Sequence, residues 1–417
     1  MLFIYRFLIN LVFIISPIIL IIRLFKKKED LTRFKEKFCF FTKEKGKGNL
    51  LWFHGASVGE LQSIIPLVEK YEKRKDINKI LITSNTLSSS KVIGKLKFKK
   101  VVHQFFPIDT NFHTKKFLNY WSPSAAFFID SEIWPNTIIN LEKKNIPILI
   151  LNGRITKKTY NRWRRFPNFS KFIFNKINLC FSSNYKSKIF LRKLGVKKIK
   201  YLGNLKFSQS ENEKIINFNY LNKIIPSKKI WCASSTHYNE EKFIGIVHKN
   251  LKKKIKNLLT IIIPRHVERT ELILKELNKL DLKVHLHDEK KIIKKDTDIY
   301  LVNSYGQTKS IYNLCKNVFL GGSIIDHGGQ NPLEATRYGC NIIYGPNVQN
   351  FEEIYSYLNK LRLSSKISSK SQLLKKLNYL FGKKNNSKRI QFKLREIGNK
   401  ILNNTFNEIN IFLKNDS

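Results

Sequence analysis

Hydrophobic residues along the chain gather in short runs that alternate with longer segments of helical periodicity. The short runs are rich in Ile, Leu, Val and Phe, which is typical of parallel strands that are buried on both faces. Most of the segments between them are amphipathic and about a dozen residues long, as crossover helices are. In the first half of the chain we therefore expect strands at residues 50–53, 80–83, 101–105, 125–129, 148–151 and 199–202.

A polar stretch at residues 209–228 interrupts this alternation, and its Asn, Ser and Pro residues are typical of a linker. The alternation then resumes, with further strands expected at residues 230–233, 258–263, 283–286, 299–302, 317–320 and 341–344. The pattern predicts an α/β protein with two Rossmann-like halves that face a central cleft. Ligands bind such sheets at the carboxyl ends of the strands.

The first residues form an apolar segment that is long enough to cross a bilayer as a helix. Residues 2–24 are mostly Ile, Leu, Phe and Val, although Arg6, Asn10 and Pro17 interrupt them, and Lys26–Lys28 follow. No small-residue cleavage site follows, so we expect a retained anchor, with the basic flank and the rest of the chain in the cytoplasm. A helix that lies within the membrane interface is the alternative.

A chain of 417 residues is long for a single core, which favours two globular domains after the anchor. We therefore expect an anchor (1–28), an N-terminal Rossmann-like domain that binds the acceptor (29–208), a linker (209–228), a C-terminal Rossmann-like domain that binds a nucleotide (229–385), and a C-terminal helix and tail (386–417).

The charge of the chain is strongly positive, with 77 Lys and Arg residues against 31 Asp and Glu residues and a net charge of +46. Such an excess suits nucleic acid, an anionic membrane or an anionic substrate as the partner. The lysines are scattered in pairs and triplets, so charge alone selects none of these. Five cysteines, an odd number with no CxxC motif, disfavour a disulfide framework and a zinc cluster.

Polar side chains follow three expected strands of the first half. After the first strand, Ser57 and Glu60 have the spacing of a capping box, although a carboxylate there could also act as a catalytic base. Asp130 and Glu132 follow the fourth strand, where an N-cap and a first-turn acid would explain them equally well. Lys206 follows the last strand and carries no information by itself in so basic a chain.

The loop from Gly321 to Ala335 is the strongest indication of a ligand site. Its four glycines, a His and the Asn331–Pro332 pair exceed what a turn requires, so we expect its backbone to approach a ligand closely. A helix starting at Asn331–Pro332 would offer its amides to a phosphate, and Glu334 would accept hydrogen bonds from a ribose. Arg265, which follows another strand, offers a planar fork to phosphate. These residues predict a nucleotide site in the second half.

Seven motifs, in this order and spacing, resemble those of the Kdo transferases of lipopolysaccharide biosynthesis, where Kdo is 3-deoxy-D-manno-octulosonic acid. The motifs are FHGASVGE, SEIWPN, NGRIT, GNLKF, STHYNEE, PRHVER and GGSIIDHGGQNPLEA. The resemblance implies the GT-B architecture of two Rossmann-like domains. It also implies an inverting, CMP-Kdo-dependent glycosyltransferase that moves Kdo to the lipid A precursor, lipid IVA, at the inner membrane.

The same resemblance implies roles for individual residues. Glu60 looks like the general base that takes the proton from the acceptor hydroxyl, and Asp130 and Lys206 align with residues that stabilise the transition state. The sequence departs from the family at Asp130, where Glu is usual, and at Gln307, where an acid is common. The segments that hold CMP align with Pro264, Arg265, Tyr305, Gly306, Gln307, Asn331, Pro332, Leu333 and Glu334, and the supporting loop positions are Ser57, Gly59, Ser323, His327, Gly328, Gly329 and Gln330.

The implied partners are the donor CMP-Kdo, the lipid A precursor and the anionic inner membrane, with no nucleic acid and no cofactor besides the donor substrate. The only DxD motif, Asp296 to Asp298, precedes an expected strand, so we predict that transfer needs no metal. Two rival interpretations are a nucleotide-sugar epimerase of the same fold and a non-enzymatic basic protein that binds a membrane surface or nucleic acid. The anchor argues against the first, and the glycine loop with its ordered acidic motifs argues against the second.

Overall fold

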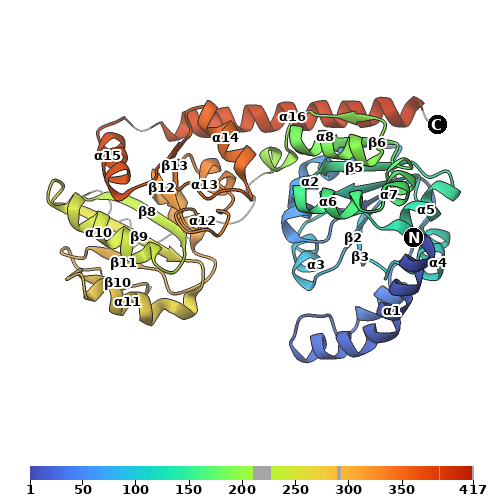
Figure 1. The fold of residues 1–417 in the computed structure, drawn as a ribbon, viewed down its shortest axis with the longest axis horizontal. Helices are drawn as coiled ribbons and strands as arrows, with labels where there is room; N and C mark the ends of the chain where they lie inside the picture. The colour runs from blue at the N-terminus through green and yellow to red at the C-terminus, as the bar shows by residue number, and fades with distance from the viewer. Residues whose placement is uncertain (210–226, 289–292, 385, 416–417) are drawn as a thin grey trace. The chain divides into compact units, whose positions relative to one another are not determined.

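The computed structural model describes residues 1–209, 227–288, 293–384 and 386–415, so most of the expected linker lies outside the described residues. Contacts within the chain divide it into two compact units. Unit 1 comprises Met1–Ser210 and Ile397–Ser417, and unit 2 comprises Glu211–Glu396. The last helix, α16 (Ser387–Asn415), therefore contributes residues to both units (Figure 1).

Unit 1 contains one sheet of seven parallel strands in the order β3-β2-β1-β4-β5-β6-β7. The strands are β1 (Leu50–His54), β2 (Lys79–Ser84), β3 (Val101–Phe105), β4 (Ala125–Ile129), β5 (Ile148–Gly153), β6 (Leu179–Ser182) and β7 (Ile199–Lys200). The helical segments are α1 (Leu2–Phe25), η1 (Phe34–Phe38), α2 (Val58–Glu72), α3 (Leu87–Gly94), α4 (Asn111–Trp121), α5 (Pro135–Lys143), α6 (Lys157–Arg164), α7 (Pro167–Phe174), α8 (Tyr185–Leu194) and η2 (Leu205–Ser208). The strand order reverses between β1 and β4, the position at which open parallel sheets bind ligands.

Unit 2 also contains one sheet of seven parallel strands, in the order β10-β11-β9-β8-β12-β13-β14. The strands are β8 (Lys229–Thr236), β9 (Leu258–Pro264), β10 (Val284–Leu286), β11 (Ile299–Leu301), β12 (Asn317–Leu320), β13 (Asn341–Tyr344) and β14 (Ser364–Lys366). The helical segments are α10 (Glu240–Lys252), η4 (Val267–Arg269), α11 (Thr270–Asn278), α12 (Thr308–Leu314), α13 (Leu333–Arg337), α14 (Glu352–Lys360) and α15 (Lys370–Phe381). Here the strand order reverses between β8 and β12.

The central strands of unit 2, such as β8 and β9, are buried on both faces, which explains their apolar sequences. Cys232 of β8 and Ile261 of β9 belong to one hydrophobic cluster, while their neighbours Trp231 and Ile262 belong to a second cluster on the opposite face. Successive side chains of a strand point to opposite faces, so each face needs its own apolar partners. The prediction of two parallel, doubly wound α/β halves is therefore confirmed.

Each sheet includes one strand that the hydrophobic pattern did not predict. β6 has only four residues, two of them Cys and Ser, and β14 consists of Ser364, Ser365 and Lys366 with no apolar side chain. Both strands lie at or next to a sheet edge, where pairing with a neighbour can form a strand without a long buried run. β7 is shorter than expected and ends at Lys200.

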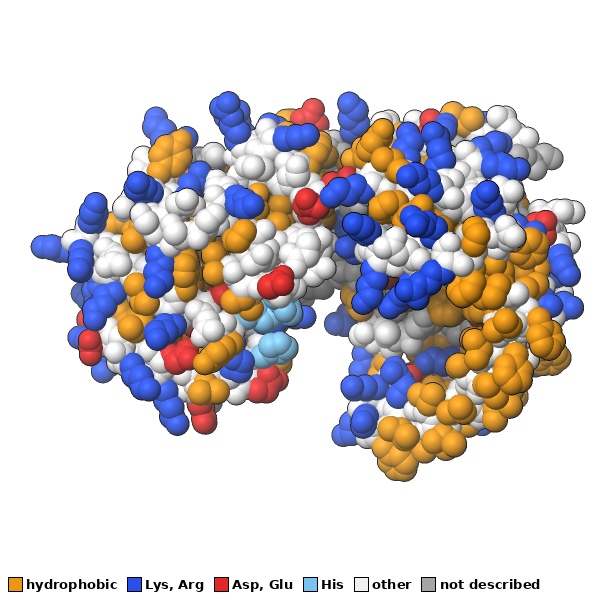
Figure 2. All heavy atoms as spheres, viewed as in Figure 1, with side chains coloured by type: hydrophobic (Ala, Val, Ile, Leu, Met, Phe, Trp, Pro, Cys, Tyr) orange, Lys and Arg blue, Asp and Glu red, His pale blue; other side chains and the backbone are white. Residues whose placement is uncertain are grey.

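Helix α1 lies against unit 1 along one side. The Tyr5 hydroxyl donates to Asp109 Oδ2 at 2.7 Å, Arg6 Nε donates to Asn136 Oδ1 at 2.9 Å, and the Phe13 ring lies 4.7 Å from the His113 ring. The other side is apolar and exposed (Figure 2), as Phe7 and Ile18 illustrate at 56% and 62% exposure. By length and composition α1 could cross a membrane, with a mean hydropathy of 2.6. Because only 11% of its most apolar window is buried, it is not a core helix.

Candidate active site

The sequence-predicted residues of unit 1 lie where the strand order of its sheet reverses. Glu60 is in the first turn of α2, which follows β1, and Asp130 directly follows β4, the strand next to β1. Lys206 lies in η2, which follows β7. The chain folds back so that Lys206 Nζ lies 3.8 Å from Asp130 Oδ2. The structure therefore brings a carboxylate and an ammonium group together at this edge of the sheet, close to Glu60.

Glu60 forms the capping box that its spacing predicts. The Ser57 hydroxyl accepts from the Glu60 backbone N–H at 3.4 Å, while the Glu60 carboxylate accepts from the Ala56 N–H at 2.7 Å and from the Ser57 hydroxyl at 2.8 Å. Burial raises the pKa of Glu60 above its usual value of 4.5, the negative charges of Glu132 and Asp130 raise it further, and the two hydrogen bonds oppose them. Burial is the largest of these effects, so a carboxylate at this position is a stronger base than an exposed one.

Asp130 is held in a backbone conformation that few residues other than glycine adopt, with φ at +61°. Burial raises the pKa of its carboxyl, and the positive charges of Lys206 and Arg154 lower it. A short polar side chain tolerates left-handed backbone better than most side chains do, because it can bond locally. Strained backbone of this kind often occurs at functional sites.

The site residues predicted from the sequence did not include His54 or Trp134, which lie beside these carboxylates. His54, the buried last residue of β1, places Nε2 3.2 Å from Glu132 Oε2, and the Trp134 indole N–H donates to the same oxygen at 2.9 Å. On its other side, His54 Nδ1 lies 2.9 Å from the Thr83 hydroxyl. Glu132 is therefore oriented by two partners. In the sequence, the signal for His54 was its position at the end of a buried strand, just before an acidic motif.

In unit 2, the glycine loop follows β12, and the SSTH segment (Ser234–His237) lies at the end of β8, so both lie where that strand order reverses. Two of the loop's glycines pack closely against neighbouring side chains of the same unit. A Cβ added at Gly322, where φ is +64°, would lie 3.2 Å from the rings of both His237 and His327. A Cβ at Gly328, where φ is +96°, would overlap the Asn350 side chain at 2.1 Å. Positive φ angles and neighbouring side chains account for these two glycines without a ligand, and the expected close approach of the loop to a ligand stays a prediction.

Glu240 organises this loop and was also missed by the sequence analysis. Its carboxylate is fully buried in the first turn of α10. One oxygen accepts from the backbone N–H groups of His237 at 3.0 Å and Gly322 at 2.7 Å, and the other accepts from Ser323 and Ile324 at 3.1 Å each. Three amides of the glycine loop are thus bonded to an internal carboxylate. The expected supporting residue Ser323 uses its N–H in this way.

Three histidines from different loops meet beside the glycine loop. The His237 ring lies 4.0 Å from the His327 ring and 6.0 Å from the His266 ring, measured between centroids. Burial and the neighbouring positive groups lower the pKa of His237 to about 4. The next residue before His266 is Arg265, whose N–H donates to the Thr236 carbonyl at the end of β8. Figure 2 shows histidine side chains gathered in one patch on this face.

The remaining predicted nucleotide contacts are not all brought together. Tyr305 and Gln307 follow β11, which β9 separates from β8, so they begin two strands away from the SSTH segment, although Tyr305 is near enough to Arg265 for the guanidinium charge to act on its phenol. Tyr305 is 63% exposed and its hydroxyl donates to Glu268 at 3.0 Å. Gln307 lines a separate cavity of about 680 Å³ with Ser304, and the Gln307 Oε1 and Ser304 Oγ atoms have no hydrogen-bond partner among the described residues.

The helix expected after Asn331–Pro332 is short. α13 has five residues, and the Asn331 side chain already accepts from the Leu333 N–H at 3.1 Å. Glu334 lies in this first turn, as predicted. Gln330, just before it, places Nε2 3.5 Å from His237 Nε2 and accepts at its carbonyl from the Tyr355 hydroxyl at 2.8 Å.

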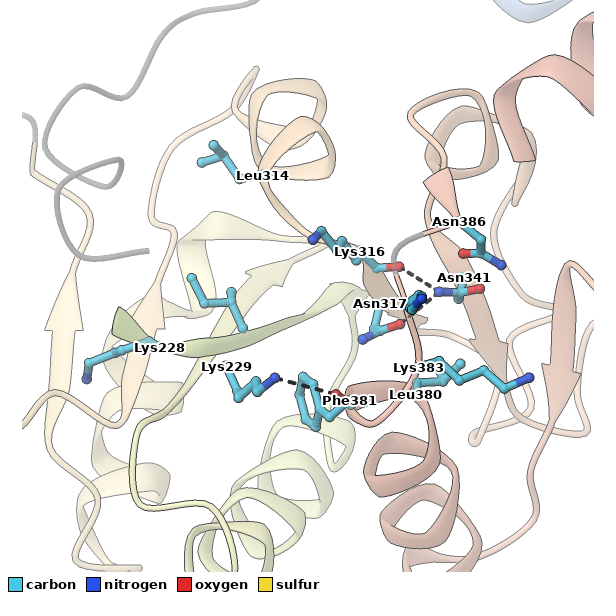
Figure 3. A pocket seen from close by; sticks show the side chains of 12 residues that line it. Lys228, Lys229, Leu314, Lys316, Asn317, Asn341, Leu380, Phe381, Lys383 and Asn386 are labelled. Carbon is cyan, nitrogen blue, oxygen red and sulfur yellow. Dashed lines mark hydrogen bonds between the residues drawn. The ribbon is translucent and has the colours of Figure 1, made fainter. Parts of the chain in front are cut away.

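Two other features lie at the opposite, amino edge of the unit 2 sheet. Asp298 of the DxD motif contacts His248 and Lys252, and Asp296 contacts Lys283 at 2.6 Å. A second cavity, of about 360 Å³, is lined by Lys229, Lys316 and Lys383 among others (Figure 3), and includes none of the predicted site residues. Among the residues that the structure describes, no group of three or more His, Cys, Asp or Glu side chains could hold a metal ion.

Comparison with known proteins identifies relatives over both units. A family model described as 3-deoxy-D-manno-octulosonic-acid transferase (kdotransferase) matches residues 32–209. The 3-deoxy-D-manno-octulosonic acid transferase of Rickettsia bellii is 33% identical over 391 residues, which cover 93% of this chain and 92% of the relative. The transferase of the same name from Haemophilus influenzae is 28% identical over 330 residues, covering 78% of this chain and 77% of the relative.

Solved structures with a similar fold are more distant in sequence. UDP-GlcNAc 2-epimerase from Neisseria meningitidis, bound to UDP-GlcNAc, gives a TM-score of 0.56 at 14% identity, covering 88% of this chain and 100% of that one. Anabaena Alr3699/HepE in complex with UDP gives the same TM-score at 9% identity, with the same coverage of both chains. These likenesses concern the fold alone, and they agree with the predicted GT-B type of architecture.

Proposed function

This chain belongs to the 3-deoxy-D-manno-octulosonic acid transferase family, and we propose from this premise that it moves Kdo from CMP-Kdo to the lipid A precursor. The observation that carries the proposal is the 33% identity to a transferase of this name over 93% of the chain, because it includes both units. The likeness to the epimerase is one of fold, at 14% sequence identity, and it does not support an epimerase activity for this chain.

Unit 1 supplies the groups for the acceptor in this proposal. Glu60 takes the proton from the attacking hydroxyl, and its raised pKa suits it to that step. Asp130 and Lys206 lie 3.8 Å apart. In this proposal they stabilise the charge that develops as the bond between Kdo and CMP breaks. In the empty protein the Glu60 carboxylate caps α2. When the hydroxyl arrives, the carboxylate exchanges one of these hydrogen bonds for the acceptor.

Unit 2 supplies the groups for CMP-Kdo. The donor is anionic, and Arg265 supplies a positive charge at the carboxyl edge of this sheet, beside the rings of the three histidines. We assign the phosphate to this edge, where ligands of open sheets bind. Tyr305 to Gln307 are the weaker candidates because β9 separates them from this position.

Donor selectivity tests the proposal against the epimerase alternative. The purified protein is incubated with CMP-Kdo and the lipid A precursor, or with UDP-GlcNAc, and free CMP and epimerised sugar are measured. We expect CMP release that depends on the acceptor, and no epimerised UDP-sugar. Epimerisation of UDP-GlcNAc without CMP release would overturn the assignment.

Gly59→Ala separates stability from activity at the acceptor site. A Cβ at Gly59 would meet no atom within 4 Å, and the residue is in helix α2, so alanine should stabilise the fold by about 0.5 kcal/mol. The methyl group would, however, occupy space that the acceptor needs beside Glu60, so we expect at least a tenfold rise in acceptor KM. Gly94→Ala is the matched control, because a Cβ there also meets nothing within 4 Å. Equal acceptor KM values in both variants would argue against an acceptor beside Glu60.

We further propose that α1 lies in the cytoplasmic face of the inner membrane and does not cross it. Its contacts through Tyr5, Arg6 and Phe13 hold it along the surface of unit 1, with the apolar side outward. A helix that crossed the bilayer would break these contacts. Such a helix binds through its exposed apolar face at the headgroup boundary.

Spin labels measure the depth of α1 directly. Cysteines introduced at the exposed positions Ile4 and Ile18 can be labelled selectively, because the five native cysteines are buried. In vesicles of anionic phospholipid we expect both labels at the same shallow depth. Labels near opposite surfaces of the bilayer would show a spanning helix instead.

A further inference from the structure

One part of unit 1 carries many basic residues and no acidic ones. Residues 143–210 contain 18 Lys and Arg residues and no Asp or Glu, in a chain that has 31 acidic residues. This stretch includes α6, α7 and α8, three helices that pack against one another. Figure 2 shows Lys and Arg side chains crowded over this part of the molecule. Any negative charge that balances these helices must therefore come from another part of the chain or from a ligand.

Arginine is used sparingly in this chain, which makes its local enrichment informative. Only 15 of the 77 basic residues are Arg, and four of these fall within residues 154–165. Arginine presents a planar fork of donors that fits phosphate, whereas lysine presents a point charge. Elsewhere several arginines are paired with acids, as Arg33 is with Glu36 and Arg269 is with Glu241.

The arginines at the joint between α6 and α7 have no such partner. Arg162, Arg164 and Arg165 are all exposed, and within the described part of the chain none of the three forms an ion pair. Phe166 follows them in the sequence and is 46% exposed, so the joint also carries an exposed apolar side chain. Trp163 holds the joint in place, because its ring lies 6.1 Å from the Phe169 ring and 5.1 Å from the Phe174 ring.

Residues on either side of the joint lie near the candidate catalytic residues and near the apolar helix. α6 begins after Thr156, three residues beyond β5. Just before this helix, the positive charge of Arg154 lowers the pKa of Asp130. With a rise of about 1.5 Å per residue, Arg162 lies about 9 Å along the helix from that start. On the other side, Phe169 of α7 lies 6.5 Å from Tyr5 of α1.

We propose that Arg162, Arg164 and Arg165 bind a phosphate group of the acceptor glycolipid. This inference rests on the proposed function. A phosphorylated lipid with its acyl chains beside α1 and its reacting hydroxyl beside Glu60 would carry its sugar phosphate across the intervening surface, where these arginines lie. Charge complementarity favours this occupant, since residues 143–210 contain no Asp or Glu and the neighbouring acid, Glu142, is paired with Lys176.

A binding measurement without donor tests the proposal independently of catalysis. The triple variant Arg162→Gln, Arg164→Gln, Arg165→Gln is compared with wild type for binding the tetraacylated, diphosphorylated lipid A precursor in detergent, and the same lipid after its phosphates are removed. Wild type is expected to bind the phosphorylated lipid about tenfold or more tightly than the dephosphorylated one, and the triple variant is expected to lose that preference. The control is Arg192→Gln, Lys193→Gln, Lys197→Gln, which removes the same charge from exposed positions on and after α8.

Each outcome of this comparison has a distinct meaning. Loss of phosphate preference in the joint variant alone supports the proposal. An equal loss in the control variant would mean general electrostatic attraction and would overturn it. Unchanged preference in the joint variant, together with weaker sedimentation with anionic phospholipid vesicles, would assign the arginines to bilayer headgroups instead. Failure of wild type to bind the phosphorylated lipid at all would reject the acceptor in the proposed function.

Discussion

Replacing Glu60 with glutamine is expected to lower kcat for Kdo transfer by about a hundredfold to ten-thousandfold, which is the range that a general base contributes. Glutamine keeps the size of the side chain and can still accept from the Ala56 N–H, so α2 should stay capped and the fold intact. Donor binding, measured separately, should be unchanged. A variant that keeps wild-type kcat would leave Glu60 as a helix cap and shift attention to Asp130.

The pH profile gives a second measure of the same role. Glu60 must be deprotonated to accept a proton, and its pKa is raised above 4.5, chiefly by burial. As the pH falls through that raised pKa, the carboxylate is protonated and activity is lost, so the acid limb of kcat/KM should lie above pH 4.5. The limb should disappear from the residual activity of Glu60→Gln. A limb that persists in this variant would belong to another group, with Asp130 the first candidate because its pKa is also raised.

Replacing Glu240 with glutamine is expected to destabilise the fold of unit 2 by about 3 kcal/mol or more. The carboxylate is buried and accepts four backbone N–H groups, and an amide would present N–H groups to some of these donors, leaving them unsatisfied. The glycine loop should then lose its fixed geometry, and donor binding should weaken at least tenfold. Chemical denaturation and titration with CMP measure the two effects.

Hydrogen exchange distinguishes loss of the loop from general loss of stability. In Glu240→Gln the amides of Gly322, Ser323 and Ile324 should exchange faster than in wild type under native conditions. Glu241→Gln is the matched control, because Glu241 is equally buried but its carboxylate is paired with Arg269 through two hydrogen bonds. Exchange at the three amides that is unchanged in Glu240→Gln, or equally raised in the control, would contradict the assignment.

The fold could be predicted well from the sequence because both sheets are buried on two faces. Twelve of the observed strands coincide with expected strands to within a few residues, and Ala125–Ile129 and Asn317–Leu320 match the expected bounds. β14 could not be predicted in this way, since Ser364, Ser365 and Lys366 carry no apolar signal and form a strand only by pairing with β13.

The candidate site was predictable in part. Asp130 stands out because it directly follows a buried strand and Glu60 because it begins the helix after another, and the structure places these two strands side by side. The approach of Lys206 to Asp130 depends on how the chain returns after β7, which local pattern does not reveal. Glu240 was missed for a related reason. A first-turn glutamate normally interacts with its own helix, and only the three-dimensional structure shows it accepting amides from a loop 82 residues away.

The glycine loop has more than one explanation. The sequence argument attributed its glycines to a ligand, whereas Gly322 and Gly328 also have positive φ angles and pack closely against His237, His327 and Asn350. The loop still lies at the reversal of strand order, next to the histidines and Arg265. Position in the sheet is therefore a better indication of this site than glycine content.

Product analysis by mass spectrometry tests the central claim most directly. The purified wild-type protein is incubated with the lipid A precursor and CMP-Kdo, with EDTA added once the donor has been formed. We predict that the acceptor gains the mass of one or more Kdo residues, that EDTA leaves the yield unchanged, and that Glu60→Gln gives little product in the same time. An acceptor that remains unmodified by folded wild-type protein that binds CMP would contradict the account.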